Sequence, residues 1–225
     1  MKAQILPGSF LAIAAIFLLF SCKKDPSGQA SATQAEVPAN AIFELLPAAQ
    51  TGVNFSNTIR ETFEENILKN SYLYNGGGVA ILDANNDGLP DLYFTATQGS
   101  NRLYLNKGSL KFEDITDLAG VAGNGGVKTG VTIADVNADG WQDIYVCRSG
   151  ALPDANRGNL LYINNGAAGM KNGVPVFTER SQEFGLNDRS PSNHANFFDY
   201  DLDGDLDCYV LNHPIAWSKV NSIRG

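Results

Sequence analysis

Residues 83–91 of the chain read DANNDGLPD, and the same pattern returns as DVNADGWQD at 135–143 and as DYDLDGDLD at 199–207. All three stretches follow D-x-[DN]-x-D-G-x-x-D, which places oxygen-bearing side chains at positions 1, 3, 5 and 9. Glycine at position 6 permits a sharp turn, and the backbone carbonyl of position 7 completes a set of oxygen ligands. Calcium prefers such a flexible, all-oxygen shell, so the pattern predicts three calcium loops.

The expected metal ligands are the residues at positions 1, 3, 5, 7 and 9 of each loop. They are Asp83, Asn85, Asp87, Leu89 and Asp91; Asp135, Asn137, Asp139, Trp141 and Asp143; and Asp199, Asp201, Asp203, Asp205 and Asp207. Zinc would require Cys or His at ligand spacing, and magnesium demands stricter octahedral geometry. The alternative is that the three stretches are Asp/Asn/Gly turns without a metal.

An EF-hand is excluded because its loop needs a bidentate Glu at position 12 and a helix on each side. Position 12 is Phe94, Val146 or Val210 here, and each lies inside a run typical of a β-strand. Such runs, rich in β-branched and aromatic residues, precede and follow every loop. They are 78–82 and 92–95, 130–134 and 144–147, and 194–198 and 208–211. Each loop is therefore expected to join two antiparallel strands.

The similarity between the units extends beyond the loops. Residues 101–108 align with 159–166, and a fourth short strand is expected around Phe112 in one unit and Phe177 in the next. The loops start 52 and then 64 residues apart, and four strands in a unit of this size are typical of a propeller blade. The predicted fold class is all-β: a β-propeller of four-stranded blades with calcium loops, forming an incomplete ring in this chain.

Three blades are expected within residues 42–225, the third one incomplete. They cover about 76–122, 123–187 and 188–225, and a first strand is expected at Ile42–Leu46. A ring needs at least four blades, because an open blade face leaves apolar surface and a strand edge exposed. We expect the chain to be a piece of a longer protein, and the alternative is several chains assembling into one ring.

The residues quoted above resemble those of the FG-GAP/VCBS repeat proteins, whose blades resemble the propellers of integrin α-subunits. The stretch from Gly76 to Phe94 is similar to Bacteroidetes lipoproteins of this kind, which often carry a C-terminal ASPIC/UnbV segment, as does the cartilage acidic protein group. The resemblance covers about 42–225 and implies calcium in the three loops. One departure is His194, which stands where the other units have Gly78 and Gly130.

The N-terminus has the features of a lipoprotein signal peptide over residues 1–21. A basic start and an apolar stretch at 10–20 precede Leu19-Phe20-Ser21-Cys22, which resembles a lipobox. Cleavage before Cys22 and lipidation of its thiol would anchor the protein to a membrane without spanning it. Lys23 after this cysteine favours the outer membrane or cell surface, and residues 22–41 have the composition of a flexible tether. The alternative is an ordinary signal peptide.

The formal net charge of −8 argues against nucleic acid as a partner, since a basic footprint is absent. Eleven of the 24 acidic residues lie in the three loops. His194 and His213 are the only histidines, and no catalytic constellation is evident, so we expect no enzyme. Cys147 and Cys208 are expected to face opposite ways and to be free thiols, with a disulfide as the alternative.

The predicted function is that of a calcium-binding propeller lipoprotein at the cell envelope, binding a protein or polysaccharide ligand in adhesion or recognition. One alternative is the propeller portion of a polysaccharide-degrading enzyme, and another is a structural spacer.

Overall fold

The structure is a computed structural model that describes residues 41–70, 72–150 and 157–213. The predicted signal peptide, the lipidation site Cys22 and all of the tether but residue 41 lie outside the described residues, as does the end of the chain from residue 214. In the described part, none of the helices has the length and apolar character that crossing a bilayer would take.

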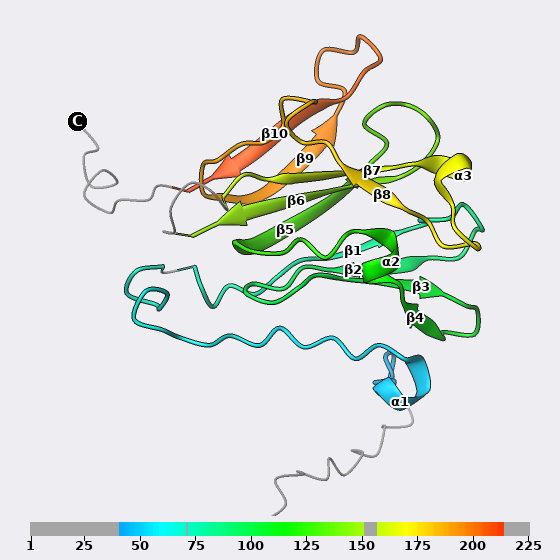
Figure 1. The fold of residues 1–225 in the computed structure, drawn as a ribbon, viewed down its shortest axis with the longest axis horizontal. Coiled ribbons are helices and arrows are strands. Elements are labelled where there is room, and N and C mark those ends of the chain that lie inside the picture. The colour runs from blue at the N-terminus through cyan, green and yellow to red at the C-terminus, as the bar shows by residue number, and fades with distance from the viewer. Residues whose placement is uncertain (1–40, 71, 151–156, 214–225) are drawn as a thin grey trace, which may run out of the picture. The chain divides into compact units, whose positions relative to one another are not determined.

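Two four-stranded antiparallel sheets, each with its strands in sequence order, form the body of the described chain (Figure 1). The first contains β1 (Val79–Leu82), β2 (Asp91–Phe94), β3 (Arg102–Asn106) and β4 (Phe112–Asp114). The second contains β5 (Val127–Ala134), β6 (Asp143–Ser149), β7 (Leu160–Asn164) and β8 (Phe177–Glu179). A third unit begins with β9 (Ser192–Phe198), paired to β10 (Asp207–Asn212). Each predicted calcium loop joins the first two strands of its sheet, as the sequence predicted.

The described residues also form three one-turn helices, the first before β1 and the other two between strands. They are α1 (Ala48–Thr51), α2 (Thr116–Ala119) and α3 (Gly166–Gly169). The expected strand at Ile42–Leu46 is wrong, because residues 41–47 form neither strand nor helix and Ile42 and Phe43 are both 89% exposed. A β-rich sequence forms a strand only where a neighbouring strand satisfies its N–H and C=O groups, and no described strand pairs with these residues.

The first strands of consecutive units contact one another: β1 contacts β5, and β5 contacts β9. Glycine is needed for this close approach. A Cβ on Gly78 would lie 2.9 Å from Val131 Cγ1, and one on Gly130 would lie 2.6 Å from His194 Nδ1. His194, the departure noted in the sequence, therefore occupies room that the glycine of the preceding unit leaves free.

The apolar core lies between the units. One buried cluster combines Tyr93, Leu103 and Leu105 of the first sheet with Ile144 and Val146 of the second. Burial of this kind between sheets is the main stabilising contribution in a stack of blades. The fold is thus all-β and propeller-like, and the sheets of the described part do not close a ring.

A second cluster lies between the second and third units, and both cysteines meet there. Tyr145 and Cys147 belong to it, and Cys208 and Val210 pack against it. Because one face of a blade packs on the opposite face of the next, two cysteines on opposite faces of consecutive units share one interface. Both are free thiols, as expected.

The outer face of the first sheet is covered by an extended segment near the N-terminus of the described chain. The ring of Phe55 stacks on Phe94 with 4.8 Å between centroids, and Phe94 meets Tyr104 edge-on. Asn57 exchanges two hydrogen bonds with Thr97, through its amide nitrogen at 3.0 Å and its amide oxygen at 2.8 Å. This segment therefore lies where a preceding blade would otherwise pack.

Candidate metal centres

All three loops share one backbone conformation. The residue at position 4 has a left-handed φ in each loop: 54° for Asn86, 54° for Ala138 and 64° for Leu202. The glycine at position 6 also has positive φ, at 83°, 85° and 97° for Gly88, Gly140 and Gly204. Positive φ is costly for Ala and Leu, so the repeated geometry shows that the loop imposes the conformation on those residues.

The carboxylate at position 1 holds each turn by accepting from two backbone N–H groups. In the first loop, Asp83 Oδ1 accepts from Asp87 N at 3.0 Å and Oδ2 accepts from Gly88 N at 2.8 Å. Asp135 and Asp199 make the same pairs of contacts in the second and third loops. The Oδ1 of position 5 accepts from the N–H of position 7 in every loop. These bonds fix the carboxylates of positions 1 and 5 in every loop.

Position 3 distinguishes the first two loops from the third. Asn85 Nδ2 donates to Asp87 Oδ2 at 2.9 Å, and Asn137 makes the same contact with Asp139. Asn85 Oδ1 is buried and has no hydrogen-bond partner. A buried amide oxygen without a partner is costly, and an oxygen-seeking cation would satisfy it.

Asp201 takes the place of asparagine in the third loop. Carboxylate oxygens of Asp199, Asp201 and Asp207 lie within 4.8 Å of one another. The pKa of Asp205 is raised, chiefly by a hydrogen bond to Asp203 and by the charge of that group. Crowded carboxylates repel, and a divalent cation would relieve this repulsion.

The position-9 aspartate fastens the loop to the sheet. Asp91 is fully buried; its Oδ1 accepts from Asn106 N at 2.7 Å and its Oδ2 accepts from Ala84 N at 2.9 Å. Asp143 repeats this with Asn164 and Val136. Burial raises the pKa of Asp91 to about 6; its two backbone hydrogen bonds oppose the rise, and the charges of Asp87 and Asp83 add to it. A nearby cation would favour the ionised carboxylate.

The position-7 side chains point to different surroundings. Leu89 is exposed, and the indole of Trp141 lies against α3, where a Cβ on Gly166 would be 3.3 Å from Trp141 Nε1. The indole of Trp141 therefore packs against the protein, as expected. The backbone carbonyls of Leu89, Trp141 and Asp205 remain the predicted ligands. Ligand oxygens of positions 1, 3 and 9 lie together in the third loop, and position 3 contacts position 5 in the first and second loops. The oxygen-rich donor set fits calcium.

The first and second loops also contact each other directly. Gln142 Oε1 accepts from Asp83 N at 2.7 Å, and Asn86 Nδ2 donates to Gly140 O at 3.1 Å. Asn164 Nδ2 adds a bond to Ala84 O at 2.8 Å. The described contacts include no such bond between the second and third loops.

One polar contact was not expected from the sequence. Ser149 Oγ lies 2.6 Å from His213 Nε2, and the ring of Tyr72 stacks on His213 at 3.9 Å. Ser149 is 1% exposed, which leaves a substrate no access to this hydroxyl. The two residues are 64 positions apart, so no local pattern in the sequence could have indicated the pair.

The FG-GAP-like repeat family matches residues 72–146. This range contains the first sheet, the first two loops and the start of β6, and the third loop lies beyond it. No curated protein matches the chain. Residues 72–146 thus carry an FG-GAP-like repeat, in agreement with the stacked, propeller-like sheets.

Proposed function

We propose that this protein is a calcium-binding, propeller-type recognition module of the cell envelope. The observation that carries the metal assignment is Asn85 Oδ1, a buried oxygen without a hydrogen-bond partner at position 3 of a loop whose other acidic groups are fixed nearby. The cluster of Asp199, Asp201 and Asp207 supports the same assignment independently.

In each loop the side chains at positions 1, 3, 5 and 9 and the carbonyl at position 7 would hold the ion. The bound ion supplies positive charge that offsets the acidic loops. The chain's own contribution is the preset turn, since the backbone N–H groups of positions 5 and 6 orient the position-1 carboxylate. Because the ion binds the folded loop, it stabilises the fold by mass action, by about 2.7 kcal/mol at 100 times the dissociation constant.

Calcium titration with and without chelator tests the assignment. We expect a chelator to lower the melting temperature and calcium to restore it. Asp203→Ala should remove one ion from the stoichiometry measured by calorimetry, while Glu113→Ala, which removes an exposed acid of β4 outside the loops, should not. An unchanged melting temperature together with no calcium by elemental analysis would contradict the proposal.

The contacts between the first two loops imply that their calcium sites are coupled, unlike the third site. Hydrogen bonds of Gln142 and Asn86 connect the first loop to the second. Asp139→Ala is therefore expected to weaken both the first and second sites, whereas Asp203→Ala should affect the third alone. If each variant lost calcium affinity at one site only, the hydrogen bonds between the first two loops would not couple their affinities.

The envelope role rests on the N-terminal signal and the lipobox-like Leu19–Cys22. A lipid on Cys22, followed by a polar tether, would hold the blades at the outer membrane or cell surface. Loops between stacked sheets are then displayed to protein or polysaccharide ligands, which is the recognition role we propose.

A further inference from the structure

A polar cavity of about 460 Å³ lies between the first and second units, away from the calcium loops. Its walls come from α2 and the chain that follows it on one side, and from β6, β7 and β8 on the other. The polar groups that matter are Asp117, Asn124, Arg148, Tyr162 and Glu179. The volume falls within the range of roughly 300–1,000 Å³ that is common for small-molecule sites.

Arg148 is the unusual member of this cavity. It is 8% exposed, and its Nη2 donates to Asn124 O at 3.1 Å, but its buried Nε has no hydrogen-bond partner. Burial lowers the pKa of this guanidinium, while Tyr162 and Glu179 favour its charged form. A buried donor of a charged group without an acceptor is costly, so an acceptor supplied by a ligand would be stabilising.

The propeller repeat does not explain this arginine. Arg148 lies five residues after the position-9 aspartate, and the corresponding residues of the other units are Ala96 and Asn212. The backbone N–H of Arg148 bonds to Asn159 Oδ1 just as that of Ala96 bonds to Asn101 Oδ1, so alanine suffices for the architecture at this position. The guanidinium is specific to the second unit.

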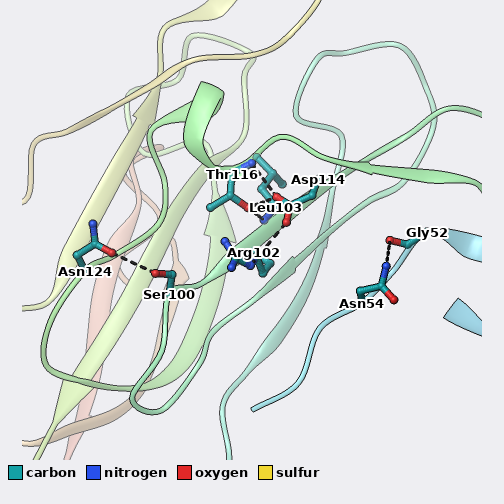
Figure 2. A network of polar contacts seen from close by, with 8 residues as sticks. All are labelled: Gly52, Asn54, Ser100, Arg102, Leu103, Asp114, Thr116 and Asn124. Atoms are coloured by element: carbon teal, nitrogen blue, oxygen red, sulfur yellow. Dashed lines mark hydrogen bonds and ion pairs between the residues drawn. The ribbon is translucent and has the colours of Figure 1, made fainter. Parts of the chain in front are cut away.

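Hydrogen bonds hold Thr116 and Asn124, which belong to the wall formed by α2 and the chain after it (Figure 2). Asn124 Oδ1 accepts from Ser100 Oγ at 3.2 Å, and this bond holds the residue whose backbone carbonyl accepts from Arg148. Thr116 Oγ1 donates to Asp114 Oδ1 at 2.5 Å and accepts from Leu103 N at 2.9 Å, which fixes the start of α2 beside Asp117. A site held in this way loses little entropy when it binds a ligand.

The donors and acceptors of the cavity select the chemistry of the ligand. Arg148 Nε donates, whereas the carboxylates of Asp117 and Glu179 accept. An anionic ligand would be attracted by Arg148 but repelled by the two carboxylates, and a cationic ligand would meet the reverse, so a single charge complements only part of the cavity. A hydroxyl group both accepts and donates without carrying a charge, so neutral vicinal hydroxyls meet all three groups.

We propose that this cavity binds a neutral saccharide unit, whose hydroxyls accept from Arg148 and donate to Asp117 and Glu179. The inference deepens the proposed recognition role and rests on it for the setting at the envelope. The site requires both units, since α2 belongs to the first and Arg148 and Glu179 belong to the second.

Ligand-observed saturation-transfer NMR with neutral methyl glycosides of glucose, galactose, mannose and N-acetylglucosamine tests the proposal. We expect at least one glycoside to bind, and more tightly than the glucuronide that adds a carboxylate. Asp117→Asn and Glu179→Gln should each weaken binding about tenfold or more, the loss expected for a hydrogen bond to a charged group. Glu179→Gln keeps an oxygen to accept from Leu161 N and Ser181 N, so the fold should persist.

Glu113→Gln is the matched control, because Glu113 is an exposed acid on β4 outside the cavity. Absence of binding by every neutral glycoside, binding that both cavity variants retain, or tighter binding of the glucuronide would each overturn the proposal. Melting temperatures of all variants are measured in calcium and in chelator. Loss of the calcium response would count against the metal assignment, and loss of glycoside binding against the cavity, so the two failures are distinguishable.

Discussion

Tyrosine recurs two residues after the position-9 aspartate of each unit, and removing its hydroxyl should have a different effect at each copy. The three residues are Tyr93, Tyr145 and Tyr209. Substitution by Phe keeps the ring and removes one oxygen, so the change in unfolding free energy reports the hydrogen bonds of that oxygen. The structure predicts a graded series in which Tyr93 is the most sensitive position.

Tyr93 is fully buried, and its hydroxyl donates to Val121 O at 2.7 Å and accepts from Asn101 Nδ2 at 2.8 Å. Tyr93→Phe leaves both groups without this partner in the core between the first two units. Each buried group left unsatisfied costs about 1–3 kcal/mol, so two such groups place the expected loss at roughly 2–6 kcal/mol.

Tyr145 makes the equivalent bonds, to Leu186 O at 2.8 Å and from Asn159 Nδ2 at 2.9 Å. Asn159 Nδ2 also donates to Ser192 Oγ at 2.9 Å and therefore keeps a partner in Tyr145→Phe. Only Leu186 O is left unsatisfied, so the expected loss is about 1–3 kcal/mol, half of that at Tyr93. Tyr209 is 60% exposed, so Tyr209→Phe should change stability by less than about 0.5 kcal/mol and serves as the control.

Urea unfolding at one saturating calcium concentration measures the series, with the dependence on urea concentration checked for equality among the variants. For a chain of this size each kcal/mol corresponds to about 2–4 °C in melting temperature. Equal losses at Tyr93 and Tyr145, or a loss above about 1 kcal/mol at Tyr209, would refute the reasoning from hydrogen-bond partners.

Two further predictions concern a buried lysine and the N-terminal cysteine. Lys128 is fully buried, with Nζ 2.6 Å from Gly99 O, and burial lowers its pKa from 10.5 to about 8. The unfolded chain binds the ammonium proton of Lys128 more tightly than the folded chain does. The free energy of unfolding should therefore rise between about pH 8 and 10.5, by at most about 3 kcal/mol relative to Lys128→Met. A difference between the two proteins that does not change with pH would contradict this prediction. Incorporation of labelled palmitate should occur in the wild type and vanish in Cys22→Ser, and retention of the label in that variant would remove the lipid anchor from the proposal.

The strands and the candidate metal loops could be predicted from the sequence because their signals are local. The spacing of Asp83, Asp87 and Asp91 around Gly88 specifies a turn through side-chain to backbone bonds inside nine residues. The β-branched and aromatic runs on both sides then pair as a hairpin whose register the loop determines. All three loops accordingly have the same conformation.

The prediction of a strand at Ile42–Leu46 was wrong because strand formation depends on more than local sequence. Strand propensity is local, but a strand also needs hydrogen-bonding partners, and those are supplied by other parts of the chain. The face of the first sheet at Phe94 is covered instead by the segment around Phe55, which forms no strand.

Contacts between units could not be predicted from the sequence pattern. The proximity of Cys147 to Cys208 and of Gln142 to Asp83, and the cavity that Arg148 shares with Asp117, depend on how one blade face packs on the next. Repetition along the chain indicates that units stack, but side-chain contacts across the interface involve residues tens of positions apart. The sequence by itself therefore determined the turns of the three loops. The buried Asn85 oxygen without a partner and the cavity at Arg148 arise only when the sheets pack together, because burial is a property of the assembled fold.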